Sequence, residues 1–481
     1  MNKAIFLLFI FLGACTKLDE GIERRDPLIA HYPALIEEEH DLDATDFPQI
    51  RLEVYLQPDK LIYSVQQEIS YVNRSPNTVH ELYFRTLMQS YGGRLTLSAA
   101  KVDEKDVQVH FEDAGGFFSI RLLEPLVPKA KSEIEFDFSA TIGGKAPKNS
   151  RLFAYHDNCL MFDYFYPSIM VNGPGGIDLS PPLSYGDLVY NEAALFTVEL
   201  TYPTDFLYAS SGVRTGSELV DSEYKKDLIV TGPARSFFLA GGFGWTKQTA
   251  QHGHTVINIL GAAGNTELLN KAAPYALEAL EIMSSILLPY PYAELDVVFI
   301  PAGWSAMEFS GIIAMGENYL PGFSAAAKKL SFRNSELILV HEMMHQWFFN
   351  YVGNDQLREP WLDEAFVQYM GRYYFSKKNG RKREQEYMTF LNNIAKESIT
   401  GPAAIDQTVY EYSNGGEYTK VVYGKAALRI AEFADFTGRE RFLEFIAWYL
   451  RKNRWHIVST TRFFKQLEDF FGEEPAAHFR L

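Results

Sequence analysis

The sequence predicts a multidomain α+β protein, in which an antiparallel β domain precedes a mainly helical domain. The chain has 481 residues, more than one hydrophobic core usually holds. In the first half, apolar side chains alternate with a period of two, as at Leu52, Val54 and Leu56, which is typical of strands. Helical spacing of apolar residues first occurs over Thr266–Leu288.

The first half is expected to form a large antiparallel sheet assembly, sandwich-like or saddle-shaped. Ile134, Phe136 and Phe138 alternate with acidic residues, and turn residues separate such runs. Further strands are expected at Val79–Arg85, Gln108–Phe111, Phe118–Leu122, Phe196–Tyr202 and Leu228–Val230.

A long irregular loop is expected over residues 171–182, where Gly and Pro are frequent. Four aromatic residues precede it, namely Phe162, Tyr164, Phe165 and Tyr166. We expect them to pack as a cluster beneath the loop. The alternative is that they form one wall of a binding cleft that faces the second domain.

Composition and charge exclude some classes of function. The net charge of −16 and the lack of a basic run argue against nucleic acid as a partner. Only Cys15 and Cys159 are present, so no disulfide framework is expected. Cys159 is expected to be a small packed residue.

The N-terminus is expected to carry a targeting signal. A short positive start precedes the apolar segment Ala4–Leu12, which is too short to span a bilayer but typical of a secretory signal. The segment Leu12–Cys15 resembles the bacterial lipoprotein signal, in which the cysteine is lipidated. The resemblance implies an exported protein of the cell envelope, held on an outer or periplasm-facing membrane by acyl chains on Cys15. The alternative is an ordinary cleaved signal with an incidental cysteine.

Four segments follow from these features. Residues 1–15 are expected to be the signal peptide and residues 16–46 a polar tether. The glycine-rich stretch Gly241–Gly244 marks the expected boundary between a β domain over 47–243 and a helical domain over 244–481.

The segment from His341 to Glu364 offers a complete metal site. On a helix, His341 and His345 share one face, and neutral imidazoles are zinc ligands. Glu364 follows His345 after eighteen intervening residues and can supply the third ligand. Glu342 is turned about 100° from His341, so it can serve as a general base toward water. The simpler alternative is a helix that carries two histidines without a metal.

These residues, together with the segment Trp361–Phe366, resemble the gluzincin aminopeptidases, the aminopeptidase N family of zinc metallopeptidases. The resemblance implies a thermolysin-like helical domain in which His341, His345 and Glu364 hold one zinc ion. It also implies that the protein hydrolyses the N-terminal bond of peptides, with Glu342 as the base.

Two further segments match motifs of this family. Ser305–Phe309 matches the Gly-Ala-Met-Glu-Asn element in its Ala-Met-Glu core, which implies that Glu308 binds the N-terminal ammonium of the substrate. Glu317 lies in a similar stretch, but we expect Glu308, not Glu317, to be the residue that corresponds to the family element. Tyr423 begins a segment similar to Tyr-x-Lys-Gly-Ala, and we expect its hydroxyl to stabilise the oxyanion.

A strand is expected at Ile312–Met315, at the edge of its sheet, where it can pair with an extended substrate. Three helices are expected after Tyr423, at about 425–436, 439–451 and 460–471. The chain then ends at Leu481, without the further helical domain usual in the family, so we expect an open cleft.

Departures from the family motifs leave two alternatives. Ser305 and Phe309 replace the Gly and Asn of the family element, and Phe349 replaces a usual Gly. If Phe309 prevents binding of the amine, the protein is a zinc endopeptidase. The other alternative is a surface lipoprotein that binds peptides without cleaving them, although the intact Glu342 argues against it.

Overall fold

The computed structural model describes residues 44–112, 116–143, 153–173, 175–180, 183, 185–187, 190–301, 305–323, 335–396 and 404–479. The expected signal peptide, Cys15 and nearly all of the expected tether therefore lie outside the described residues. None of the described helices is both long and apolar enough to span a bilayer.

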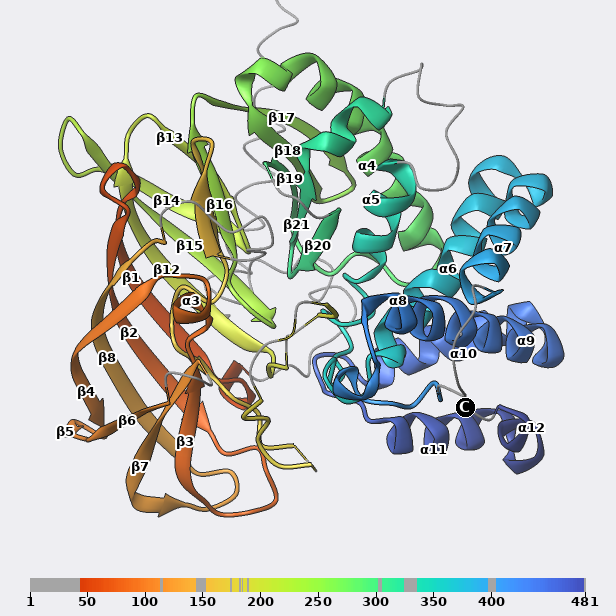
Figure 1. Ribbon diagram of the computed structural model, residues 1–481, viewed down its shortest axis with the longest axis horizontal. Coiled ribbons are helices and arrows are strands. Elements are labelled where there is room, and N and C mark those ends of the chain that lie inside the picture. Colours follow the sequence, from red (N-terminus) through yellow and green to blue (C-terminus); the bar gives the residue numbers. More distant parts are fainter. Residues whose placement is uncertain are drawn as a thin grey trace, which may run out of the picture.

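The first half of the chain forms β sheets (Figure 1). The largest sheet has eight strands, in the order β14 (Val213–Leu219), β15 (Tyr224–Ala234), β12 (Ala194–Pro203), β1 (Gln49–Gln57), β2 (Ile62–Val72), β8 (Lys131–Thr141), β4 (Arg94–Val102) and β5 (Lys105–Asp106). Its neighbours pair antiparallel except β1 and β12, which run parallel. In β8 every second residue is buried, and in β2 the same alternation runs from Ile62 to Ile69, as the period of two predicts.

Two smaller sheets complete the β domain. One has the order β13 (Phe206–Ser210), β16 (Leu239–Phe243), β10 (Cys159–Phe162) and β9 (Phe153–His156). The other has the order β11 (Ser168–Ile169), β3 (Val79–Arg85), β7 (Phe117–Leu126) and β6 (Val109–Glu112). A short helix, α3 (Leu87–Ser90), follows β3. A single hydrophobic cluster draws side chains from all three sheets.

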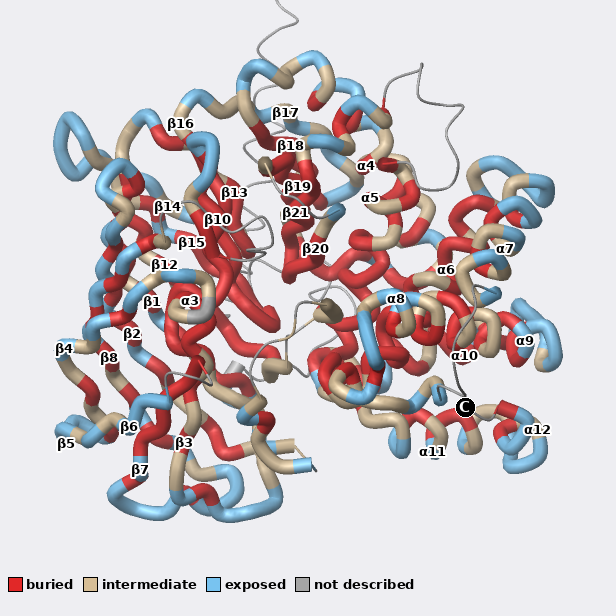
Figure 2. Tube along the Cα trace, viewed as in Figure 1, coloured by how far each residue is buried: buried red, intermediate tan, exposed pale blue. Residues whose placement is uncertain are grey.

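The second half begins with a five-stranded mixed sheet. Its order is β17 (Trp245–His252), β18 (Thr255–Ala262), β19 (Glu294–Ile300), β21 (Ile312–Gly316) and β20 (Ala306–Phe309). One face of this sheet packs on the sheet of β9, β10, β13 and β16 through a shared cluster that includes Phe238, Phe309 and the buried free Cys159. Figure 2 shows buried chain on both sides of this contact.

Helices form the rest of the chain. They are α4 (Thr266–Ile286), α5 (Ser335–Met344), α6 (Trp361–Asn379), α7 (Arg381–Lys396), α8 (Gly415–Tyr418), α9 (Ala427–Thr437), α10 (Arg439–Lys452), α11 (Thr460–Phe471) and α12 (Glu473–His478). A π-helical segment, η8, spans Thr419–Ala426. Short 3-10 turns lie at Ala44–Asp46, Pro58–Lys60, Ala263–Asn265, Glu317–Phe323 and Val409–Glu411. The predicted fold class, a β domain followed by a helical domain, is therefore confirmed.

One local expectation is corrected. The strand at Ile312–Met315 is not at an edge, because β21 lies between β19 and β20. The chain reverses at Gly311, whose φ of +75° suits a glycine, so β20 folds back on β21 and becomes the edge strand itself.

Candidate metal centre and active-site cavity

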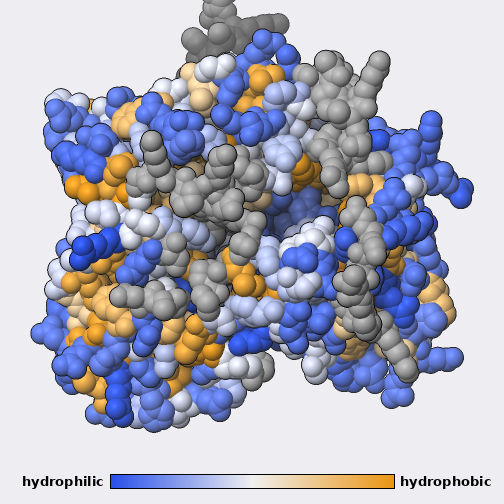
Figure 3. Space-filling model, in the orientation of Figure 1, coloured by the Kyte–Doolittle hydropathy of each residue, from blue (hydrophilic) through white to orange (hydrophobic). Residues whose placement is uncertain are grey.

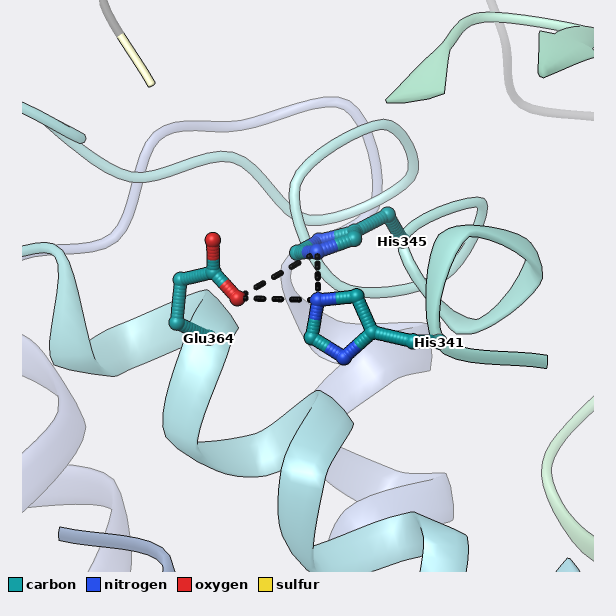
Figure 4. Close-up of side chains that lie close together, drawn as sticks. All are labelled: His341, His345 and Glu364. Carbon is teal, nitrogen blue, oxygen red and sulfur yellow. Dashed lines mark hydrogen bonds and ion pairs between the residues drawn. The ribbon is translucent and has the colours of Figure 1, made fainter. Parts of the chain in front are cut away.

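Two histidines meet at the end of α5. His341 lies in the last turn of the helix and His345 directly follows Met344, where the helix ends. Their Nε2 atoms nevertheless lie 3.3 Å apart, as the four-residue spacing predicts (Figure 4). His345 Nδ1 lies 3.2 Å from the carbonyl oxygen of Phe348. Since a carbonyl only accepts, this contact places a proton on Nδ1 and leaves Nε2 as the nitrogen that faces the other two ligands.

Glu364 brings the third ligand from the first turn of α6. Its Oε2 lies 3.2 Å from His341 Nε2 and 3.5 Å from His345 Nε2 (Figure 4). Burial alone would raise the pKa of this carboxyl, but the two imidazoles hold it well below its ordinary value. Glu364 stays charged, and its Oε2 is buried without a hydrogen-bond partner among the described residues. An orphaned carboxylate oxygen facing two imidazole nitrogens fits a divalent cation with nitrogen and oxygen ligands.

Two more carboxylates lie beside this group. Ligand atoms of Glu308, Glu342 and His345 lie within 4.8 Å of one another, and all three residues are buried. Burial raises the pKa of Glu342 well above its ordinary value, and the neighbouring Glu308 raises it further. Two carboxyl groups this close repel each other when charged, so a cationic group between them is stabilised.

Glu308 is positioned by residues that follow the metal helix. Gln356 Nε2 donates to Glu308 Oε1 over 3.3 Å. Gln346 donates to the carbonyl of Phe309 over 2.9 Å and accepts from the amide of Gly311 over 3.0 Å. The edge strand β20 is therefore attached directly to the segment that carries His345.

Tyr423 approaches from the π-helical segment Thr419–Ala426. Its hydroxyl donates to Glu364 Oε1, and its ring stacks on His341 with centroids 5.7 Å apart. Burial raises the pKa of Tyr423 well above its ordinary value, and Glu364 adds to the effect. The phenol therefore keeps its proton and remains a donor. A π-helical turn at such a position is common at functional sites.

The structure adds Asp187, which sequence reasoning missed. This residue belongs to the irregular chain between β11 and β12 and lines the same cavity as the metal ligands. It lies beside Glu364, and burial together with Glu308 and Glu364 raises its pKa well above the ordinary value. No motif surrounds Asp187 in the sequence, so only its position in space reveals it.

One cavity of about 450 Å³ joins these groups. It contains four carboxylates, and none of the described residues that line it is Lys or Arg. Figure 3 shows a hydrophilic hollow on the face between the β sheets and the helices. The carboxylates are Asp187, Glu308, Glu342 and Glu364. A cavity of this composition favours cationic ligands.

Other expected features lie away from the cavity. Glu317 does not line it, whereas Glu308 does. The Phe309 ring stacks on Phe238 with centroids 3.9 Å apart, in the contact between two sheets and outside the cavity lining. The four aromatic residues ahead of the irregular loop are all buried; Phe162, Phe165 and Tyr166 lie in the core of the β domain, whereas Tyr164 packs in a separate small cluster with Leu87 and Phe349. The cavity wall comes instead from Tyr185–Asp187, farther along the same loop.

The part of the chain that carries the proposed metal ligands is similar to a known protein family. Residues 272–478 match the model of the peptidase family M1 domain. The chain carries a peptidase family M1 domain. The resemblance predicted from the motifs is thereby confirmed, and the M1 domain contains every residue of the His341–Glu364 site and Tyr423.

Curated aminopeptidases are similar to part of the chain. Aminopeptidase M1-D of Oryza sativa is 24% identical over 291 residues, which are 58% of this chain and 33% of the relative. Human endoplasmic reticulum aminopeptidase 2 is 31% identical over 172 residues, which are 34% of this chain and 17% of the relative. The chain thus spans about one third or less of the length of these relatives.

Solved structures share the fold over nearly the whole chain. The crystal structure of an M1 zinc metallopeptidase from Deinococcus radiodurans covers 90% of this chain and 92% of its own, with a TM-score of 0.66 and 17% identity. A mutant of that protein bound to a Tyr-Ser-Ala substrate matches equally well, with a TM-score of 0.66. The arrangement of a β domain followed by a helical domain is common to both proteins.

Proposed function

We propose that this protein is a zinc-dependent aminopeptidase that hydrolyses the N-terminal bond of peptides. The observation that carries the proposal is the convergence of His341, His345 and Glu364 in a cavity with Glu308 and Glu342. The family of the M1 domain and the aminopeptidase names of its relatives agree with it.

Zinc suits the three proposed ligands. Two imidazole nitrogens and one carboxylate oxygen form a frequent set in catalytic zinc sites, which keep one position open. Bound there, zinc would supply Lewis acidity, acidifying water and polarising the scissile carbonyl. Proton transfer, binding of the substrate amine and stabilisation of the oxyanion are assigned to residues of the chain.

Glu342 is proposed as the general base. It belongs to the same helix as His341 but is not one of the three ligands that face each other. A buried carboxylate with a raised pKa is a better base toward water than an exposed one, and after accepting the proton it can pass it to the leaving amine. Such groups typically contribute about 10²–10⁴ in rate.

Glu308 and Asp187 are proposed to bind the N-terminal ammonium of the substrate. Glu308 belongs to the edge strand β20, which has a free edge among the described strands for an extended peptide backbone. Asp187 approaches from the β domain, so the ammonium would be held by both domains. A charge-assisted pair in a partly desolvated cavity places the scissile bond one residue inward.

Tyr423 is proposed as a donor to the developing oxyanion. Its hydroxyl carries a proton at neutral pH and lies at the metal ligand Glu364, on the His341 side of the cavity. Substrate would draw this donor from Glu364 toward the carbonyl oxygen as negative charge develops there.

The two alternatives are less well supported. An endopeptidase was expected if Phe309 blocked the amine site, but this ring packs against Phe238 outside the cavity lining. A protein that only binds peptides has no need of Glu342 beside the metal ligands.

One assay separates the three functions. Purified protein is incubated with a free peptide and with its N-acetylated form, with and without a zinc chelator. We expect chelator-sensitive cleavage of the free peptide alone. Equal cleavage of both peptides would instead identify an endopeptidase, and no chelator-sensitive cleavage of either would identify a binding protein.

Paired carboxylate variants test the roles within the cavity. Glu308→Gln should raise KM for the free peptide by at least about tenfold, because one ammonium pair is lost. The matched control is Glu317→Gln, which removes a carboxylate from the similar motif outside the cavity and should leave KM unchanged. Glu342→Gln should retain zinc but lose turnover, and turnover by this variant would refute the base assignment.

We further infer that the protein is exported and anchored to a membrane of the cell envelope through lipidated Cys15. The support is the sequence of residues 1–15, which resembles a lipoprotein signal. We also propose domain limits of 47–243 and 244–481, with residues 16–46 as the tether. Cys15→Ser should move the protein from the membrane fraction to the soluble fraction of expressing cells. Unchanged fractionation would refute the anchor.

A further inference from the structure

A second cavity lies between turns of the β domain and the turn that joins α10 to α11. Its volume is about 830 Å³, and it shares none of its described lining residues with the metal cavity. The β domain contributes the turns around residues 72–74 and 129–131, and the helical part contributes residues 451–457. Its basic side chains are Arg74, Lys129, Lys131, Arg235, Arg451, Lys452 and Arg454.

The charge of this basic cavity has the opposite sign to the net charge of the whole protein. Seven Lys or Arg residues face two carboxylates, Asp46 and Glu192, so the lining has a formal charge of +5 in a chain whose net charge is −16. The positive potential of the arginines affects the pKa of His456. Partial burial lowers its pKa, and Arg74, Arg235 and two further arginines lower it to about 4.

Arg235 forms the buried floor of the basic cavity. It is 2% exposed, and its guanidinium donates to three carbonyl oxygens, those of Phe349 at 3.0 Å, His456 at 3.1 Å and Asn191 at 3.2 Å. Carbonyl oxygens satisfy the N–H groups but carry no formal charge. No described carboxylate lies within 4.0 Å of this guanidinium, so its positive charge is hydrogen-bonded without being neutralised.

The exposed rim offers little compensation. Arg74 Nη1 lies 3.7 Å from Glu192 Oε2, and Lys452 Nζ lies 3.9 Å from Asp469 Oδ2. The side chains of Lys129, Lys131 and Arg451 form no ion pair with any residue that the structure describes. The basic cavity therefore holds several cations at close quarters with too few counter-charges, and a bound anion would relieve their repulsion.

We propose that the basic cavity binds a compact anion of the phosphate class. A single carboxylate carries one negative charge, whereas a phosphate group carries about −1.5 to −2 and three acceptor oxygens, which suits several cations at close quarters. Arginine and lysine together suit this group, because the guanidinium offers a fixed pair of donors and the ammonium a mobile charge. The phosphate can belong to a soluble molecule or to an anionic lipid headgroup.

Calorimetric titration of the full chain with pyrophosphate tests the soluble source. We expect one site per chain, with an affinity that falls as salt rises, since salt screens the cations of the rim. The double variant Lys131→Gln/Arg451→Gln removes two exposed cations that have no ion pair, so it should fold normally and bind at least about tenfold more weakly. Binding is measured without substrate, so the result is independent of the peptidase activity.

A matched control carries the same change in net charge. Lys105→Gln/Lys377→Gln neutralises two exposed lysines outside the basic cavity and should keep the affinity within about twofold of wild type. If both double variants weaken binding equally, the effect comes from net charge and the site is refuted.

Vesicle sedimentation tests the lipid source. Vesicles containing phosphatidylglycerol are compared with neutral phosphatidylcholine vesicles, using protein with Cys15→Ser so that no acyl chain contributes. Binding to the anionic vesicles that is lost in Lys131→Gln/Arg451→Gln, without binding of pyrophosphate, would assign the cavity to a headgroup. If neither pyrophosphate nor the anionic vesicles bind through these residues, the proposal fails.

Discussion

Gln356 Nε2 donates a hydrogen bond to Glu308 Oε1 over 3.3 Å, which links the loop after the metal helix to the edge strand of the sheet. The same nitrogen donates to Asp363 Oδ2 over 2.8 Å, and Asp363 Oδ1 accepts from the backbone amide of Glu364. The buried side-chain amide of Gln356 thus fixes the position of Glu308, which is proposed to bind the ammonium, relative to Asp363 beside the metal ligand Glu364.

Replacing Gln356 should affect substrate binding more than turnover. In Gln356→Met, Glu308 loses a donor that fixes its carboxylate, so we expect KM for a free peptide to rise by about tenfold with kcat within about twofold. Steady-state kinetics with a measurement of bound zinc check this. A fall in zinc content would show instead that Gln356 supports the metal through Asp363.

Replacing Tyr423 should affect turnover more than binding. Tyr423→Phe keeps the ring that stacks on His341 and removes only the hydroxyl. We expect kcat to fall by about 10²–10³, as for other oxyanion donors, with KM nearly unchanged. If kcat is retained and bound zinc is lost, the hydroxyl serves Glu364 alone and the oxyanion role is wrong.

Asp187 should contribute to binding of the substrate amine across the two domains. Asp187→Asn preserves the size of the side chain and removes its charge, so KM for free peptides should rise by roughly three- to tenfold. The increase should disappear in the Glu308→Gln background if both carboxylates bind one ammonium, which a double-mutant cycle measures. Additive effects would place Asp187 at another part of the substrate.

Metal removal should destabilise the helical domain. Zinc at about 1,000 times its Kd adds about 4 kcal/mol to the stability of a native state that binds it, so chelation should lower Tm by several degrees. His345→Ala should start from a lower Tm and show no further change with chelator. An equal chelator effect on both proteins would place the metal elsewhere.

His456 should make stability depend on pH in the acidic range. Its pKa is about 4 in the folded protein against an ordinary 6.5, so below 6.5 the unfolded chain binds the proton more readily. The stabilisation is therefore present above pH 6.5 and is lost as pH falls toward about 4. Because more than a third of this residue is exposed, screening should keep the loss at or below about 1 kcal/mol.

The measurement is Tm against pH for wild type and His456→Asn in phosphate-free buffer. Wild type should lose more stability than the variant between pH 6.5 and about 4. Parallel curves would mean that the arginines around His456 do not repel its protonated form.

Local patterns in the sequence predicted much of the fold and the metal site. Apolar alternation located strands such as β1 and β8, and helical spacing located α9, α10 and α11 within two residues of their ends. The edge strand was assigned wrongly, because strand order depends on a turn at Gly311 and on pairing between distant segments. Neither is visible in the periodicity of a single strand.

Sequence alone predicted the proposed metal ligands, because the four-residue spacing of His341 and His345 brings their imidazoles together and Glu364 follows in the first turn of the next helix, α6. Only the tertiary structure decided which other charges meet them. Asp187 reaches the metal cavity from the β domain, and the cations of the basic cavity come from turns hundreds of residues apart. Electrostatic environment depends on distance in space, whereas a motif records only distance along the chain.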